Sequence, residues 1–326
     1  MSVFTTVKQA QLESFLGRYE IGSLRSFEPI AAGITNTNYF LDTTGGEFVL
    51  TLYEHHSDDE LNYMLGLQRH LAGKSVLCPA PMEDRRGDLF STLNQRPAAI
   101  IARLPGKVQE SPGVTHCAAI GAELARFHLA GADFDGRRAN PRGADWVLAT
   151  GDMLEAGLED SDRPLLASTL KEYVRLDRAA LPAGAIHADL FHDNALFDGD
   201  RLCGIVDFDY ACHDSFVFDL AVLLHDWCIG AGGGFDGLRI DAVLEAYQQE
   251  RILGEAEIRA LPVMLRFSAL RFWLSRLYDR LFPLPGELTF SKDPGAFHRL
   301  LLARREGENE LERLFLPHLR NSQARG

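Results

Sequence analysis

The ten residues from Ala185 to Asn194, AIHADLFHDN, constrain the fold and chemistry of this chain more than any other stretch. A short apolar strand leads into a loop that carries Asp189, and Asn194 follows five positions later. A second apolar segment, 201–206, delivers Asp207 to the end of a predicted β-hairpin beside that loop. The pattern therefore predicts that two carboxylates and one amide converge.

Transfer of a phosphoryl group from ATP to a hydroxyl requires that set of groups. One carboxylate takes the proton of the attacking hydroxyl, while an amide oxygen and a second carboxylate hold magnesium on the phosphates. Two other interpretations stay open. The Asp and Asn could simply cap a helix and shape a turn. Alternatively, His187, Asp189, His192 and Asp193 could bind a hydrolytic metal, although the chain has no His-x-His pair or Cys cluster at ligand spacing.

Composition narrows the class of protein. The 326 residues are enough for two lobes, and a hydrophobic content of 46% indicates a globular chain. No apolar run approaches the ~20 residues of a membrane span, and the N-terminus lacks the pattern of a secretion signal. Five cysteines without a Cys-x-x-Cys pair favour the reducing cytoplasm. The net charge of −13 argues against nucleic-acid or anionic-membrane partners, but it selects no substrate and no oligomeric state.

The periodicity predicts an α+β chain in two lobes. An N-lobe, residues 1–105, should contain a small antiparallel sheet, and a C-lobe, residues 106–326, should be mainly helical. Strands are expected at 24–32, 38–43, 47–53 and 98–104, and a loop at 133–145. Helices are expected at 8–19, 58–73, 114–131, 162–180, 214–228, 237–252, 255–281 and 294–315.

The His-x-Asp-x-x-x-x-Asn pattern with the later apolar-Asp-Phe resembles the aminoglycoside/choline kinase branch of the protein-kinase-like fold. The resemblance implies a bilobal kinase that uses ATP and Mg²⁺. It implies that Asp189 is the catalytic base and that Asn194 and Asp207 are magnesium ligands. His187 would support the catalytic loop, and Asp219 would anchor it.

The same resemblance implies where the nucleotide binds. The loop 31–38 would cover the phosphates, and backbone groups near Ile101 and Arg103 would meet the adenine. An ordinary hairpin loop is the alternative for 31–38. The expected phosphate-loop residues are Gly33, Thr35, Asn36, Thr37 and Asn38. Kinases place a lysine on the third strand, but Thr51 occupies that position, so either other groups carry the phosphate charge or the chain only binds.

Further segments narrow the resemblance to bacterial homoserine kinases, over nearly the whole chain. They are Val3–Thr5, the Ala32–Phe40 loop, the Thr51 strand, Leu270–Asp279 and Lys292–Pro294. This implies phosphorylation of the side-chain hydroxyl of L-homoserine, a step toward threonine. Alternatives are a choline, ethanolamine or aminoglycoside kinase, or a pseudokinase that only binds.

The chemistry of homoserine predicts which residues would hold it. The carboxylate needs a guanidinium, for which Arg271 and Arg276 are candidates, because arginine can grip a carboxylate in two places. The ammonium needs an acid, for which Asp209 and Asp279 are candidates. Ordinary ion pairs are the alternative explanation for these arginines.

Overall fold

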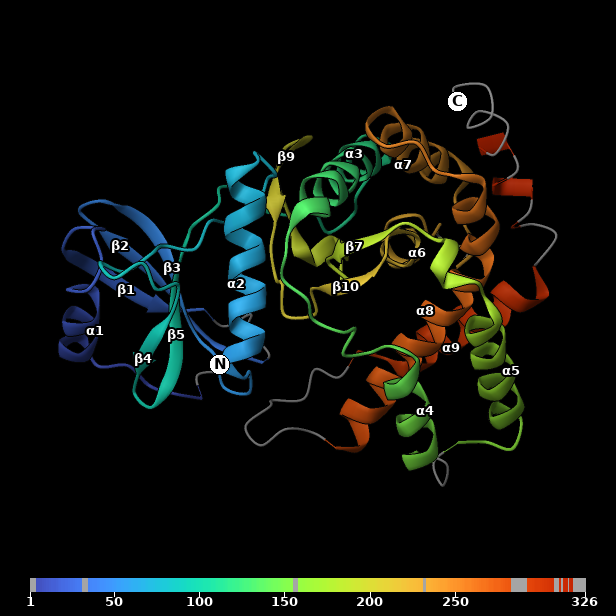
Figure 1. The fold of residues 1–326 in the computed structure, drawn as a ribbon, viewed down its shortest axis with the longest axis horizontal. Helices are drawn as coiled ribbons and strands as arrows, with labels where there is room; N and C mark the ends of the chain where they lie inside the picture. The colour runs from blue at the N-terminus through green and yellow to red at the C-terminus, as the bar shows by residue number, and fades with distance from the viewer. Residues whose placement is uncertain are drawn as a thin grey trace. The chain divides into compact units, whose positions relative to one another are not determined.

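The structure is a computed structural model that describes residues 4–30, 35–154, 158–230, 233–282 and 292–307, together with residues 311, 313–315, 317 and 318. Within these residues the chain divides into two compact units, one ending at Pro105 and the other beginning at Gly106. Each unit has its own sheets and helices, as the ribbon in Figure 1 shows.

The first unit is built on a five-stranded sheet with the order β1-β2-β3-β5-β4. Every neighbouring pair of strands is antiparallel. The strands are β1 (Leu24–Pro29), β2 (Thr37–Thr43), β3 (Gly46–Leu52), β4 (Ser91–Leu93) and β5 (Arg96–Ala102). The turn at Thr44-Gly45 joins β2 and β3, because glycine at Gly46 tolerates a φ of +140° that other residues avoid.

Alternation of side chains explains how this sheet buries one face. Tyr39 and Leu41 of β2 and Leu50 of β3 point to the same side, since successive strand residues face opposite sides. The helix α1 (Gln9–Leu16) packs Leu12 and Phe15 into that cluster. Figure 1 shows α1 and α2 (Asp58–Gly73) on either side of the sheet.

The helix predicted over 58–73 is α2, and acidic residues form its first turn. Ser57 accepts a hydrogen bond from the Glu60 amide, and the Glu60 carboxylate accepts one from the Ser57 amide at 3.0 Å. This reciprocal capping satisfies two amide groups that a helix start otherwise leaves unpaired.

The second unit contains two small antiparallel sheets. One pairs β7 (Ala183–Ile186) with β10 (Cys212–Ser215), and the other has the order β6-β8-β9. These strands are β6 (Lys107–Val108), β8 (Ala195–Asp198) and β9 (Arg201–Ile205). The β8–β9 pair is the hairpin that the sequence predicted before Asp207.

Helices make up the rest of the second unit. Its core is α8 (Glu255–Leu281), which packs on α6 (Phe216–Trp227), α5 (Asp162–Arg175) and α9 (Pro294–Glu306). The helix α3 (Val114–Ala130) packs on α7 (Gly237–Glu250), and α4 (Ala144–Met153) contacts α5. Short 3-10 turns occupy Gly131–Asp133, Arg178–Ala180 and His192–Asn194.

The predicted elements agree with these bounds except at a few places. The helix expected over 162–180 ends at Arg175, because Leu176 is extended, and only a 3-10 turn follows. The loop expected over 133–145 already contains the start of α4. The strands β4, β6 and β10, of three, two and four residues, were missed because such short strands carry no periodic signal. Within the described ranges, no helix combines the length and apolar character that a membrane crossing requires.

Candidate active site

The loop after β7 brings Asp189 and Asn194 into direct contact. Asn194 lies at the end of the 3-10 turn His192–Asn194, and its amide nitrogen donates to the backbone oxygen of Asp189 at 2.8 Å. The same nitrogen lies 3.3 Å from Asp189 Oδ2. The five-residue spacing thus closes a compact loop, and the amide oxygen is the Asn194 atom that remains for another partner.

Asp207 lies next to this loop because the preceding residue, Val206, is hydrogen-bonded to the loop. The Val206 amide donates to the backbone oxygen of Asn194 at 2.9 Å. His187 bridges the two segments, since its Nε2 is 3.0 Å from the Val206 oxygen and its Nδ1 accepts from the Asp189 amide at 3.3 Å. Three of the predicted residues, at positions 189, 194 and 207, therefore belong to one connected structure.

Asp219 holds the start of this loop from α6. Its two carboxylate oxygens accept hydrogen bonds from the His187 amide at 2.8 Å and the Ala188 amide at 2.7 Å. Ala188 has a φ of +63° and Asp207 has a φ of +65°, a left-handed backbone that is unfavourable for residues with a Cβ. The anchor from Asp219 supplies the bonds that keep Ala188 in this conformation.

His128 and Tyr247 complete the anchor, and the sequence pattern had indicated neither. His128 Nε2 is 3.1 Å from Asp219 Oδ2, and His128 Nδ1 is 2.7 Å from the Tyr247 hydroxyl. Burial alone would raise the pKa of Asp219, but hydrogen bonding and charge from His128 hold that pKa below its usual value. Burial lowers the pKa of both His128 and His187, while the Asp219 carboxylate acts on each in the opposite sense.

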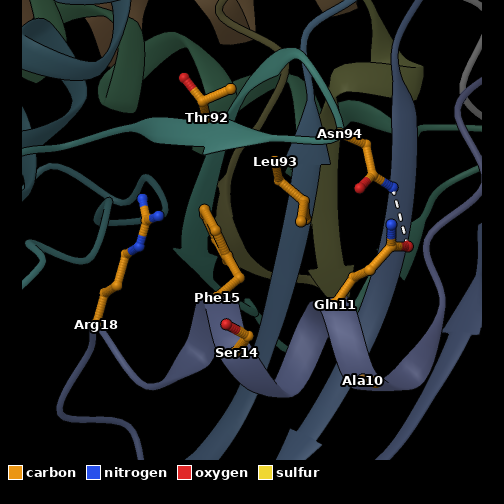
Figure 2. Close-up of a pocket in the computed structure, with 8 residues that line it drawn as sticks. All are labelled: Ala10, Gln11, Ser14, Phe15, Arg18, Thr92, Leu93 and Asn94. Carbon is orange, nitrogen blue, oxygen red and sulfur yellow. Dashed lines mark hydrogen bonds between the residues drawn. The ribbon is translucent and has the colours of Figure 1, made fainter.

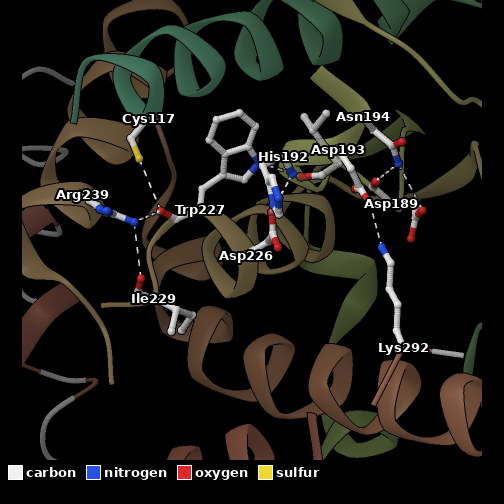
Figure 3. A network of polar contacts seen from close by, with 11 residues as sticks. Cys117, Asp189, His192, Asp193, Asn194, Asp226, Trp227, Ile229, Arg239 and Lys292 are labelled. Carbon is white, nitrogen blue, oxygen red and sulfur yellow. Dashed lines mark hydrogen bonds and ion pairs between the residues drawn. The ribbon is translucent and has the colours of Figure 1, made fainter. Parts of the chain in front are cut away.

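Two further residues of α6 hold the far end of the loop. Asp226 Oδ2 accepts from the His192 amide at 2.6 Å and lies 2.7 Å from His192 Nδ1. The Trp227 indole donates to the Leu190 oxygen at 3.0 Å. Figure 3 shows Trp227 in one view with His192 and Asp226. Asp219 and Asp226 are seven positions apart, so two turns of α6 present both to the loop.

Charge at the loop is arranged around Asp189. Burial raises the pKa of Asp189 to about 7, while the Arg271 guanidinium, 3.7 Å away, opposes that rise and Asp207 adds to it. Solvent reaches Asp207, yet the dense protein around it and the Asp209 carboxylate raise its pKa to about 7. Such mutually repelling carboxylates are stabilised by a cation.

Arg271 forms an ion pair with Asp189. Its side chain is 3% exposed, and it also stacks on the Tyr210 ring at 4.9 Å. Arg276, one turn further along α8, stays half-buried and donates to the Asp293 backbone oxygen at 3.3 Å. Asp209 uses its backbone amide to reach Asp207 Oδ1 at 3.3 Å. Asp279 is exposed on α8.

The rival metal-hydrolysis interpretation gains no support from the geometry. Across the described residues, no group of three or more His, Cys, Asp or Glu side chains could hold a metal ion. His192 is engaged by Asp226, and His187 by the backbone on both of its nitrogens.

The predicted nucleotide residues lie in the first unit. The Thr51 hydroxyl donates to Asn38 Oδ1 at 2.8 Å, so two of them contact each other. Thr37 is fully buried, and its hydroxyl donates to Glu54 and accepts from the Phe4 and Thr5 amides.

The remaining predicted nucleotide residues are less informative. Asn36 Oδ1 accepts from the Glu54 amide at 3.4 Å, and Arg103 lies over the Phe40 ring and 3.3 Å from Glu47. Ile101 pairs with Val49 in the sheet, Thr35 lies among the described residues just before β2, and Gly33 lies outside the described residues.

A hollow of about 390 Å³ in the first unit lies away from the predicted nucleotide residues. Figure 2 shows it between α1 and β4, lined by residues that include Phe15, Arg18 and the hydrogen-bonded pair Gln11 and Asn94. None of the residues predicted to bind nucleotide or acceptor lines it.

The chain is similar to known proteins in both sequence and fold. The model of the phosphotransferase enzyme family matches residues 26–253. A homoserine kinase from Methylobacillus flagellatus is 46% identical over 301 residues, which cover 92% of this chain and 94% of that protein.

Two solved structures show the shared fold. An amicoumacin kinase in complex with AMP-PNP, Ca²⁺ and Ami has a TM-score of 0.71 at 16% identity, covering 92% of this chain and 94% of that one. A spectinomycin phosphotransferase in complex with ADP and spectinomycin has a TM-score of 0.65 at 13% identity, covering 93% and 100%. The predicted α+β kinase-like fold is confirmed. The family model covers more than half of this chain, and the match to a homoserine kinase covers nearly all of it. This chain therefore belongs to the homoserine kinases of the phosphotransferase enzyme family.

Proposed function

We propose that this chain transfers the γ-phosphate of ATP to the side-chain hydroxyl of L-homoserine, in the reducing cytoplasm. The observation that carries the proposal is the connected loop structure in which Asp189, Asn194 and the backbone leading to Asp207 are hydrogen-bonded together. The similarity to homoserine kinases supports the acceptor. The five cysteines, all buried and free, support the compartment.

Asp189 is proposed to orient the acceptor hydroxyl and to accept its proton. A pKa of about 7 suits this task, because a base is most effective when its pKa is near the working pH. Arg271 keeps that pKa from rising further, so we assign it to Asp189 rather than to the acceptor carboxylate. His187 and Asp219 position Asp189 through the backbone.

The donor groups at this loop suit Mg²⁺. Asn194 and Asp207 would hold the ion through oxygen atoms, which Mg²⁺ prefers, and a cation would relieve the repulsion among the crowded carboxylates. When bound, Mg²⁺ neutralises the charge of the transferred phosphate. The first unit is proposed to bind the nucleotide, with Asn38 and Thr51 as the lining pair in place of a strand lysine.

Release of ADP in a coupled assay tests this proposal. Homoserine should be phosphorylated in preference to choline, ethanolamine or an aminoglycoside, and Asp189→Asn should lower kcat by about 10²- to 10⁴-fold while ATP still binds. The control is Asp198→Asn, an identical change at a carboxylate 70% exposed in β8. Homoserine-independent ADP release, or full activity of Asp189→Asn, would remove the proposed reaction or the proposed base.

A further inference from the structure

Arg276 faces carboxylates but pairs with none of them in the described part of the chain. Its guanidinium lies over the Phe297 ring at 4.4 Å and makes one hydrogen bond, to the Asp293 backbone oxygen. Desolvation by burial lowers its pKa, and charges from Asp226 and Asp189 act on it in the opposite sense. A half-buried guanidinium with unused N–H donors is suited to a carboxylate ligand.

Asp193, next to the catalytic loop's Asn194, is only half satisfied. Its Oδ2 accepts from Lys292 at 2.7 Å, as Figure 3 shows, whereas its Oδ1 is buried without a hydrogen-bond partner in the described structure. Buried polar atoms in folded proteins nearly always have a partner, so an unpaired carboxylate oxygen requires a reason. The ion pair itself is half exposed, with side chains 51% and 41% accessible, and such pairs are weak.

Ser275 adds an independent sign of a ligand on the same side of α8. It follows Arg271 by four positions, so both lie on one helix face, and Arg271 presents that face to Asp189. The Ser275 hydroxyl is buried, and within the described residues it has no hydrogen-bond partner.

We infer that a zwitterionic amino acid inserts into the Asp193–Lys292 ion pair: Asp193 binds its ammonium, and Lys292 and Arg276 bind its carboxylate. This deepens the proposed function and rests on it, because the acceptor hydroxyl must still reach Asp189. The exchange conserves charge, since one ion pair is replaced by two. Ser275 supplies a further donor or acceptor for the inserted ligand.

Three small molecules distinguish the contributions of the two charged groups of the acceptor, its ammonium and its carboxylate. L-homoserine carries both groups, 3-aminopropan-1-ol is the same molecule without the carboxylate, and 4-hydroxybutanoate is the same molecule without the ammonium. L-2-aminobutanoate carries both the ammonium and the carboxylate but no hydroxyl, so it should bind as a competitive inhibitor. Its inhibition constant measures binding of the two charged groups even where an analogue is phosphorylated too slowly to measure.

The experiment measures kcat/KM of the full chain for each acceptor, and the inhibition constant of L-2-aminobutanoate. Arg276→Met should lower kcat/KM for homoserine about 10- to 100-fold, the effect of one lost charged hydrogen bond, and leave 3-aminopropan-1-ol unaffected. Asp193→Asn should produce a similar loss for homoserine and spare 4-hydroxybutanoate. Both variants should weaken inhibition by L-2-aminobutanoate at least 10-fold.

The matched control is Arg280→Met, the same change one turn further along α8 at an exposed position, which should alter none of these values. Equal losses on all acceptors, or unchanged discrimination and inhibition, would overturn the inference. Absence of homoserine-dependent ADP release from the unmodified chain would instead refute the proposed function before any variant is compared. The Arg276 and Lys292 side chains are half exposed. If Asp193→Asn does not fold, the variants Arg276→Met and Lys292→Met therefore test the inference in its place.

Discussion

Removal of the Arg271 charge should move the pH dependence of the reaction to higher pH. Arg271 is the cation closest to Asp189 among the described residues, and it favours the ionised carboxylate against the effect of burial. In Arg271→Met that support is lost, so the pKa of Asp189 rises. Because the base must be deprotonated, activity appears as pH increases through this pKa, and the acid limb of the profile shifts upward.

The size of the shift follows from the distance. At 3.7 Å between Arg271 Nη1 and Asp189 Oδ1, an effective dielectric constant of about 20 gives about 4.5 kcal/mol. This equals about 3 pH units at 1.36 kcal/mol per unit and is an upper bound, because the Asp189 side chain is 17% exposed. We expect a shift of about 1 to 3 units. The ionised fraction at pH 7 would fall from about one half to roughly one tenth to one thousandth.

The assay is kcat/KM for homoserine from pH 6 to about pH 10, at one fixed ATP concentration. Arg271→Lys retains the charge and should keep the acid limb near its original position, whereas Arg271→Met should regain most activity at high pH. Arg280→Met is the control for an arginine lost from the same helix. A uniform loss at every pH, with an unshifted limb, would refute the assignment of Arg271 to Asp189.

Three further changes test the anchor, the metal ligand and the unusual strand. Asp219→Ala leaves two backbone amides and a histidine without an acceptor at about 1–3 kcal/mol each, so the thermal unfolding midpoint should fall by about 10 °C; a change under about 2 °C would contradict the anchor. Asp207→Ala should abolish magnesium-dependent ADP release, and an unchanged magnesium titration would remove Asp207 from the metal site. Thr51→Lys should give no gain in kcat/KM for ATP, because Thr51 is buried and bonded to Asn38; a large gain would mean that the pocket accepts the charge.

Local patterns predicted the elements that depend on near neighbours. The helices over 58–73 and 255–281 and the β8–β9 hairpin were predictable because a few adjacent residues determine each of them. The loop residues Asp189 and Asn194 were readable for the same reason, since their contact closes over five positions.

The distant residues that contact that loop and its anchor could not be predicted from local patterns. Lys292 bonds to Asp193 across 99 positions, and His128 bonds to Asp219 across 91. In the sequence His128 was one polar residue on a helical face and Arg271 was one of two candidate substrate arginines; only folding gave the first a buried acceptor and the second a carboxylate.

The sequence alone predicted the fold class, the loop with Asp189 and Asn194, the hairpin before Asp207, and the family resemblance, because these depend on short-range spacing. The tertiary structure alone decided which charges meet: Arg271 with Asp189, Lys292 with Asp193, and Arg276 with a backbone oxygen only. The physical reason is that an electrostatic interaction depends on distance and burial in space, and both arise only when helices far apart in the chain pack together.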